Sequence, residues 1–369
     1  MIKGRATTTG TAAYAARFPH LPGNYRPAMD LAISSIGLGT YLGETDARTD
    51  AAYAESLRLA LSLGLNLIDT AVNYRLQRSE RVIGQVLKEA IEGGTLKREE
   101  VVIATKGGYV TFDGAMPPDP RAWFQDHFVR TGIVEAGDLV DGSHCMTPKW
   151  LTAMIELSRA NLGLETLDVY YVHNPESQLA QIDRAEFRRR LEKAFELLER
   201  KAAEGAIGAY GAATWNGFRI EAAERAYLSL AEMIEAAERV GGRNHHFRMI
   251  QLPYNLAMTE AFTARNQATP NDGLRSTLAA ADAAGIAVCA SASLLQGRLG
   301  RRLPPLVDEA FGGLASDAQR AVQFVRSTPG VTSALVGMST AAHVRDIAAT
   351  ATQPPAPFAS IMKLFHPAE

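Results

Sequence analysis

Eight short runs of mostly apolar residues recur along the chain, and they limit the folds that this sequence can adopt. None of the runs alternates cleanly between polar and apolar positions. Continuous apolarity of this kind is typical of strands that are buried on both faces, as in a parallel sheet. The runs cover residues 33–43, 65–71, 101–108, 167–174, 207–214, 249–255, 286–293 and 332–339.

Helical patterns separate these runs. Residues 50–63, 80–90 and 186–204 each place apolar side chains at helical spacing on one face. Strands that alternate with helices eight times predict an α/β fold of the closed (β/α)₈ TIM-barrel type. The alternative is an open, doubly wound sheet, but its G-x-G-x-x-G fingerprint is missing, because residues 37–43 contain one residue too many.

Composition and charge argue against several classes of protein. With 47% hydrophobic and 21% charged residues, the chain of 369 residues can bury a large core. The net charge of −2 predicts no nucleic-acid partner and no binding to a membrane surface. No run reaches 18 apolar residues, and residues 1–20 lack the apolar stretch of a signal peptide, so neither a membrane span nor secretion is expected. Cys145 and Cys289 form no CxxC motif. A cytoplasmic protein is expected, and no feature indicates its oligomeric state.

Two segments depart from the repeating pattern. Residues 1–30 are expected to form a poorly ordered or surface-draped extension, and residues 31–369 a single barrel domain. Residues 109–147 form a long insertion that is rich in proline and aromatic residues. Because long connections in compact domains are usually functional or disordered, we expect a partly ordered wall or lid over the substrate pocket. The alternative is a segment that packs on the flank of the barrel or mediates an oligomer contact.

Polar residues stand at the ends of three consecutive runs. Asp69 ends the second run and is followed five residues later by Tyr74, while Lys106 ends the third run and His173 the fourth. The active sites of α/β barrels lie at the C-terminal ends of the strands. A carboxylate, a phenol, an ammonium and an imidazole are therefore expected to converge in one pocket.

This set of groups suits the reduction of a carbonyl, whose oxygen gains a proton as its carbon gains a hydride. A free tyrosine, with a pKa of about 10, is a poor acid at neutral pH. The ammonium of Lys106 is expected to lower the pKa of Tyr74, and Asp69 is expected to hold Lys106 by an ion pair. The imidazole of His173 is expected to orient the substrate oxygen by a hydrogen bond.

The four residues lie in segments that resemble the signature segments of the aldo-keto reductases, namely GLNLIDTAVNYRLQRSERVIGQVL, VVIATKGG and LDVYYVHNP. The Asp-x₄-Tyr element followed by R-S-E-R-V-I-G is the most specific of them. The resemblance implies a (β/α)₈ barrel that uses NADP or NAD to interconvert a carbonyl, in an aldehyde, ketone or sugar-like compound, and an alcohol. It also implies catalytic roles for Asp69, Lys106 and His173, with Tyr74 as the general acid and base.

The same resemblance implies cofactor contacts near the ends of the later runs. Gln251 matches a glutamine that contacts the nicotinamide amide, and residues 294–298 match the loop beside the pyrophosphate. Gly337 and His343 replace the lysine and arginine that often grip a 2′-phosphate, so NADPH is expected to be only slightly favoured over NADH. The expected contacts are Thr214, Gln251, Ser291, Leu294, Gly297, Arg298, Gly337, Ser339, His343 and Arg345.

Other functions stay open at this point. A lysine at a strand end, such as Lys106, is also compatible with a Schiff-base aldolase, which needs a lysine with a depressed pKa. A catalytically silent regulatory barrel that binds the cofactor would keep the same fold. No metal site is expected, because His144 and Cys145 lack further ligands at suitable spacing and the adjacent His245 and His246 are poorly placed to bind one ion.

Overall fold

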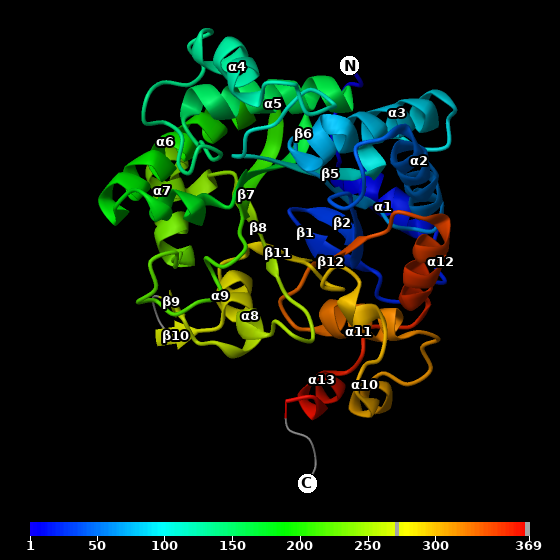
Figure 1. The fold of residues 1–369 in the computed structure, drawn as a ribbon. Coiled ribbons are helices and arrows are strands. Elements are labelled where there is room, and N and C mark those ends of the chain that lie inside the picture. The colour runs from blue at the N-terminus through cyan, green and yellow to red at the C-terminus, as the bar shows by residue number, and fades with distance from the viewer. Residues whose placement is uncertain (270–272, 366–369) are drawn as a thin grey trace.

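The chain folds into a closed barrel of eight parallel strands surrounded by helices (Figure 1). The computed structural model describes residues 1–269 and 273–365. Neighbouring strands pair in chain order, and the last strand closes on the first. A barrel strand overlaps each of the eight apolar runs, so the predicted (β/α)₈ fold is confirmed. The strands are β3 (Ile36–Gly39), β4 (Leu67–Asp69), β5 (Val102–Gly107), β6 (Leu167–His173), β7 (Ile207–Ala213), β8 (Phe247–Pro253), β11 (Ala287–Ser291) and β12 (Ser333–Gly337).

Helices surround the barrel and bury their apolar faces against it or against one another (Figure 1). The longer helices are α2 (Ala47–Ser62), α3 (Arg78–Glu92), α5 (Pro148–Leu162), α6 (Arg184–Ala203), α7 (Leu230–Gly241), α11 (Asp317–Ser327) and α12 (Ala341–Ala349). The remaining elements are α1 (Thr8–Ala16), β1 (Tyr25–Ala28), β2 (Leu31–Ser34), α4 (Pro120–Phe124), α8 (Glu260–Thr263), β9 (Gln267–Thr269), β10 (Gly273–Arg275), α9 (Thr277–Ala283), α10 (Pro305–Ala310) and α13 (Phe358–Lys363). None of the helices in the described ranges has the length and apolarity needed to cross a membrane.

Alternate residues of the strands fill the interior of the barrel. Leu67 of β4 and Val102 of β5 pack in one buried cluster with residues of the other strands. Because successive side chains of a strand point to opposite faces, residues an even number further along face the same side. Asp69 and Lys106 therefore also face the interior, at its C-terminal end. The same count along β6 places His173 there, so buried strands carry polar groups into one end of the barrel.

The first thirty residues pack on the barrel, so the surface-draped alternative describes them and the poorly ordered one does not. Tyr14 of α1 is 1% exposed, and its hydroxyl donates a hydrogen bond to the carbonyl oxygen of Leu61 at 2.5 Å. The hairpin of β1 and β2 packs on the interior cluster of the barrel through side chains such as Ile33. The expected boundary after residue 30 falls in the turn of this hairpin, so the extension and the barrel share one element.

The insertion leaves and rejoins the barrel through paired backbone. The Val110 amide donates to the carbonyl of Ser143 at 2.8 Å, and the Cys145 amide donates to the carbonyl of Gly108 at 2.8 Å. Between these pairs the chain makes an excursion that carries α4 past α5 at the outer edge of the molecule (Figure 1). The start and the end of the insertion are thus held together at the mouth of the barrel.

The aromatic cluster of the insertion, formed by Trp123, Phe124 and Phe128, packs against the outside of the barrel. Trp123 stacks on His127 with ring centroids 3.9 Å apart, and Phe128 lies 4.8 Å from Trp150 of α5. The apolar surfaces of these side chains are buried against one another and against α5, so they do not cover the mouth of the barrel. The predicted lid is therefore wrong for the aromatic cluster, and the alternative of packing on the flank describes it.

Candidate functional site

The structure brings Asp69, Tyr74 and Lys106 together at the C-terminal end of the barrel. Lys106 Nζ lies 2.8 Å from both carboxylate oxygens of Asp69, 2.8 Å from the carbonyl oxygen of Thr70 and 3.4 Å from the hydroxyl of Tyr74. The lysine is 0% exposed. Burial alone would lower the pKa of Lys106, but Asp69 and Tyr74 outweigh it, and the pKa is raised above its usual value. The ammonium is therefore charged at neutral pH.

The phenol of Tyr74 stays protonated at neutral pH. Burial raises its pKa, and the charge of Lys106 opposes that rise without cancelling it. The sequence predicted a lowered value because it showed the cation but not the depth of the pocket. A protonated phenol with an ammonium 3.4 Å away can give up a proton to an acceptor in the cavity, since the cation stabilises the phenolate left behind.

An unusual backbone turn follows Tyr74 and places its ring. Arg75, Leu76 and Gln77 have φ angles of +48°, +55° and +75°, a left-handed conformation that side-chain-bearing residues seldom adopt in succession. Arg75 donates to the carboxylate of Asp50 at 2.6 Å, which fastens the turn to α2. Such strain persists only where the surroundings enforce it, and it clusters at functional sites.

His173 lies across from Tyr74, with their ring centroids 5.9 Å apart. Burial, followed by the charge of Lys106 and the proximity of His144, holds the pKa of His173 well below its usual range. The imidazole is therefore neutral and offers one N–H donor and one acceptor. Its Nδ1 is buried and has no hydrogen-bond partner among the described residues.

Gln251 of β8 contacts the same group of residues. Its Nε2 donates to Oδ1 of Asp69 at 2.8 Å, so the carboxylate accepts hydrogen bonds from both a lysine and a glutamine. The sequence assigned Gln251 to the nicotinamide amide. The structure places it at the wall of the cavity, but with its amide engaged by Asp69.

A cavity of about 850 Å³ opens above these residues, within the usual size of ligand pockets. It extends from Tyr74 and His173, past β11, to the N-terminal part of α12. Lys106 lies beneath its floor, behind Asp69 and Tyr74. The predicted cofactor contacts that line the cavity are Thr214, Gln251, Ser291, Leu294, Gly297, Gly337, Ser339 and His343.

Two predicted cofactor contacts do not line the cavity. Arg345 is exposed on α12 and lies two residues beyond His343, so it points to a different side of the helix. Asp346 lies three residues beyond His343, on the same side, and lines the cavity. Arg298 is exposed in the turn after Gly297, and Arg301 is the arginine of that loop that reaches the cavity wall. A sequence match cannot decide which arginine of a turn points inward.

The far end of the cavity has groups that suit an anion. Thr340 caps α12, its hydroxyl accepting from the amide of His343 at 3.3 Å, and the first amides of a helix favour negative charge. Arg301 and His343 add basic side chains at the same end, while Asp346 adds a carboxylate. The donor set thus fits an elongated ligand with phosphate groups away from its reactive end, as a nicotinamide dinucleotide has in its pyrophosphate and NADP also in its adenosine 2′-phosphate.

Trp215 after β7 is 45% exposed and lines the cavity as an aromatic residue. Two further aromatic residues of the cavity were not predicted from the sequence. Tyr41 after β3 is 58% exposed and its ring lies 5.0 Å from that of Tyr74. Tyr109, at the start of the insertion, contacts His173 edge to face at 5.1 Å. These rings make the substrate end of the cavity aromatic. Their position just after strand ends was a signal that the sequence contained.

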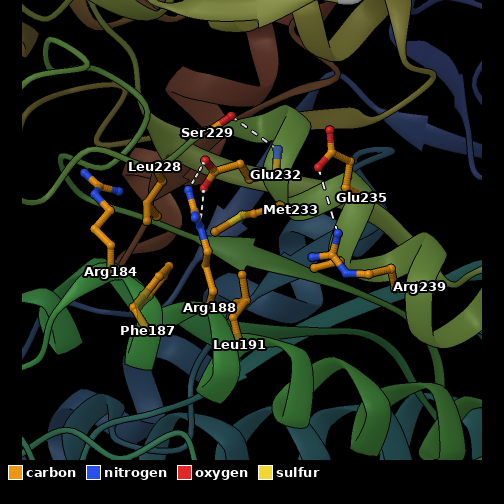
Figure 2. Close-up of a pocket in the computed structure, with 11 residues that line it drawn as sticks. Arg184, Phe187, Arg188, Leu191, Leu228, Ser229, Glu232, Met233, Glu235 and Arg239 are labelled. Carbon is orange, nitrogen blue, oxygen red and sulfur yellow. Dashed lines mark hydrogen bonds and ion pairs between the residues drawn. The ribbon is translucent and has the colours of Figure 1, made fainter.

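A second hollow, of about 220 Å³, lies between α6 and α7 (Figure 2). Most of its charged side chains pair with one another, Arg188 with Glu232 at 2.6 Å and Arg239 with Glu235 at 3.9 Å, whereas Arg184 donates to the carbonyl oxygen of Tyr227 at 2.7 Å. These paired charges neutralise each other at the surface. We therefore interpret the hollow as a groove between two packed helices. In the described ranges no three His, Cys, Asp or Glu side chains gather in a way that could hold a metal ion.

Comparisons with known proteins agree with this geometry. The sequence profile of the Aldo/keto reductase family matches residues 35–302. A D-threo-aldose 1-dehydrogenase from a Pseudomonas species is 30% identical over 193 residues, which are 50% of this chain and 51% of that protein. The NADH-specific methylglyoxal reductase of Escherichia coli is 28% identical over 154 residues, 39% of each chain. The aligned stretches thus span about half or less of these two relatives.

Solved structures match over almost the whole chain. An aldo/keto reductase from Klebsiella pneumoniae, determined with NADP and acetate, aligns with 94% of this chain and 97% of its own, with a TM-score of 0.61. The identity is 21%, so this likeness shows the fold.

Proposed function

Because the chain belongs to the aldo/keto reductase family, we propose that it is an NAD(P)-dependent oxidoreductase that interconverts a carbonyl and an alcohol in a small molecule, with Tyr74 as the general acid and base. The observation that carries this proposal is the contact of Tyr74 with the buried ion pair of Lys106 and Asp69, at the floor of the cavity. A nicotinamide cofactor bound in the cavity would supply the hydride for the carbonyl carbon.

Tyr74 supplies the proton that this reaction needs. In reduction its O–H donates to the carbonyl oxygen, the O–H bond of the phenol breaks, and a new O–H bond forms in the alcohol. The phenolate that remains is stabilised by Lys106, whose ammonium lies 3.4 Å away, and takes a proton back from solvent. In the oxidation direction the phenolate accepts the proton of the alcohol, whereas the raised pKa of Tyr74 keeps the resting residue in the protonated form that reduction uses.

Asp69 and His173 act around this proton transfer. Asp69 holds Lys106 with two hydrogen bonds of 2.8 Å, so the cation cannot swing away from the phenol. His173 is neutral and faces Tyr74, and its N–H orients the carbonyl oxygen toward the hydroxyl of Tyr74. Neither residue changes its charge during turnover.

The cofactor is proposed to be NADP or NAD, held along the cavity from Gln251 and Ser291 to the N-terminus of α12. The adenosine phosphate would lie near His343 and Arg301. The loop at Gly297 would have room for the pyrophosphate, because a Cβ built there meets no atom within 4 Å. The proposed location is the cytoplasm, since both cysteines are free and buried.

The Schiff-base alternative is disfavoured by the state of Lys106. An amine must be neutral to attack a carbonyl. Lys106 is instead held as a cation, with its pKa raised and its three N–H groups directed at Asp69, Thr70 and Tyr74. A regulatory barrel that binds cofactor without turnover is separated from an enzyme by the assay below.

The test uses Tyr74→Phe, which keeps the ring and removes the proton. We expect the wild-type protein to oxidise NADPH or NADH in the presence of aldehydes or ketones. In the variant kcat falls by about 10²-fold or more, as for the loss of a general acid. The dissociation constant of the cofactor, measured by quenching of tryptophan fluorescence, stays nearly unchanged.

Tyr41→Phe is the matched control, because Tyr41 lines the same cavity and its ring lies 5.0 Å from that of Tyr74. It should keep its activity. Full activity of Tyr74→Phe would disprove the assigned role. Cofactor binding by a wild-type protein that reduces no carbonyl and oxidises no alcohol would instead support the regulatory barrel.

A further inference from the structure

His144 lies at the end of the insertion and contacts the backbone of His173. Its ring is 1% exposed, and its Nε2 lies 2.7 Å from the carbonyl oxygen of His173. A carbonyl oxygen only accepts hydrogen bonds, so the proton of the imidazole is on Nε2. The other ring nitrogen, Nδ1, lies 2.8 Å from Nε2 of Gln178 and accepts its hydrogen bond.

The orientation of the Gln178 amide is fixed independently. Its Oε1 accepts from Nη1 of Arg190 at 2.8 Å, and a guanidinium has no acceptor, so the oxygen must face the arginine and the NH₂ group must face His144. Burial lowers the pKa of His144 to about 4, which keeps the ring neutral as this pattern requires. One tautomer of His144 therefore satisfies the whole chain of hydrogen bonds from α6 to β6.

The same arginine ties the chain of hydrogen bonds to the insertion. Arg190 also donates to the carbonyl oxygens of Gly137 and Asp138, at 3.2 and 3.5 Å. The insertion, α6 and the end of β6 are thus connected through side chains with defined donors and acceptors. Gln178 is fully buried, so its hydrogen bond to His144 does not compete with solvent.

The peptide that accepts the hydrogen bond from His144 is itself strained. Asn174, immediately after His173, has a φ angle of +43°, which a residue with a side chain adopts at a cost. A Cβ built on Gly108 would lie 2.8 Å from the carbonyl oxygen of His173 and 2.9 Å from Nε2 of His144, so only glycine lets this bond form. The ring of Tyr109 lies edge-on to both histidines, at 5.0 and 5.1 Å.

From this geometry we propose that His144 is a positioning residue: by holding the carbonyl of His173, it sets the direction of the His173 imidazole in the active site. The proposal rests on the proposed function, in which His173 orients the carbonyl of the substrate. According to this proposal, the insertion contributes to the reaction through His144 at its paired ends, although its aromatic cluster lies on the flank of the barrel.

The central experiment compares His144→Leu with His144→Gln. Leucine fills the space and removes the donor, whereas the amide of glutamine can donate to the His173 carbonyl again. We expect kcat for carbonyl reduction to fall by about 10- to 100-fold with leucine, since small misplacements near reacting groups have effects of this size. Glutamine should restore most of the loss, and cofactor affinity should be unchanged in both variants.

A double variant separates positioning from general structural damage. If His144 acts through His173, then His144→Leu lowers kcat much less in a His173→Ala background than in the wild type. Gly108→Ala, which crowds the same hydrogen bond, should resemble His144→Leu. His127→Leu is the control, because His127 belongs to the insertion, is exposed and stacks on Trp123 away from the cavity.

A second readout does not depend on turnover. In protein labelled with ¹⁵N-histidine, the ring resonances of His173 should shift in His144→Leu and stay in place in His127→Leu. Unchanged resonances and unchanged kcat in His144→Leu would overturn the proposal, as would an equal loss in the His173→Ala background. If the wild-type protein shows no turnover at all, the proposed function fails, whereas the resonances still test the link between the two histidines.

Discussion

Replacing Asp69 by asparagine tests the buried charge pair directly, because asparagine has nearly the same shape and no charge. Lys106 Nζ lies 2.8 Å from both carboxylate oxygens. Either orientation of the new amide therefore places its NH₂ group against the ammonium. Rotating the amide cannot relieve this contact, and the lysine, which is 0% exposed, keeps no anionic partner.

The loss of stability follows from leaving a buried charge unpaired. Removing one partner of a buried ion pair costs about 3–5 kcal/mol. We expect the free energy of unfolding of Asp69→Asn to fall by about this amount at neutral pH. Turnover should fall as well, because Lys106 is no longer held beside Tyr74.

The deficit should depend on pH in a defined direction. In the wild-type protein the folded pKa of Lys106 is raised, so its stabilisation is complete below the unfolded value and is lost as pH rises through the folded value. In Asp69→Asn burial remains without the carboxylate, so the lysine pKa falls below its unfolded value. The folded variant then binds fewer protons than the unfolded chain, and its stability rises with pH. The difference from wild type should shrink between about pH 7 and about pH 9.

Urea unfolding at several pH values measures this effect, with Asp168→Asn as the control. Asp168 is 5% exposed and pairs with Arg98 at 2.7 Å, at the opposite end of the barrel. Arginine keeps its charge over this range, so the Asp168→Asn deficit should stay constant with pH, and the folded variant should remain active. A loss of less than about 1 kcal/mol in Asp69→Asn, or a deficit that grows with pH, would refute the reasoning.

Two further predictions concern the cofactor preference and the insertion. NADPH should bind less than about tenfold more tightly than NADH in equilibrium titrations, because the carboxylate of Asp346 offsets the basic groups nearby. Arg301→Ala should weaken the binding of NADPH more than that of NADH, and a thousandfold preference of the wild-type protein for NADPH would contradict this. Replacing residues 112–139 by a short Gly/Ser linker should lower the melting temperature, because the contacts of the aromatic cluster are lost. The variant should still bind cofactor and keep most of its kcat, because Tyr109 and His144 are retained. Loss of cofactor binding in a folded variant would contradict this prediction.

The sequence was sufficient to predict the barrel and the meeting of the four polar residues. Both follow from local rules, since buried strands are continuously apolar and the last inward-facing residue of each strand reaches the same end of the barrel. The positions of Asp69, Lys106 and His173 could be predicted from the alternation of side chains along their strands alone. Their roles in the reaction stay predictions until the variants are measured.

Other features depend on contacts that no local pattern encodes. The turn after Gly297 decides that Arg301, and not Arg298, faces the cavity. His144 reaches β6 because the insertion folds back on itself over more than thirty residues, a distance at which spacing carries no information. Lys106 lowers the pKa of Tyr74 as expected, but burial outweighs it and the pKa is raised, and this burial depends on packing by several elements that no local pattern encodes.

The paired ends of the insertion also bear on how such a protein can diverge. Because the backbone of residues 108–110 is bonded to that of residues 143–145, the excursion between them starts and finishes at one place. Closing a longer loop at a fixed base costs only about 0.6 kcal/mol for each doubling of its length. Segments of other lengths and sequences can therefore be exchanged at this base by recombination while His144 keeps its register with His173, which makes the base a natural junction for building chimaeras.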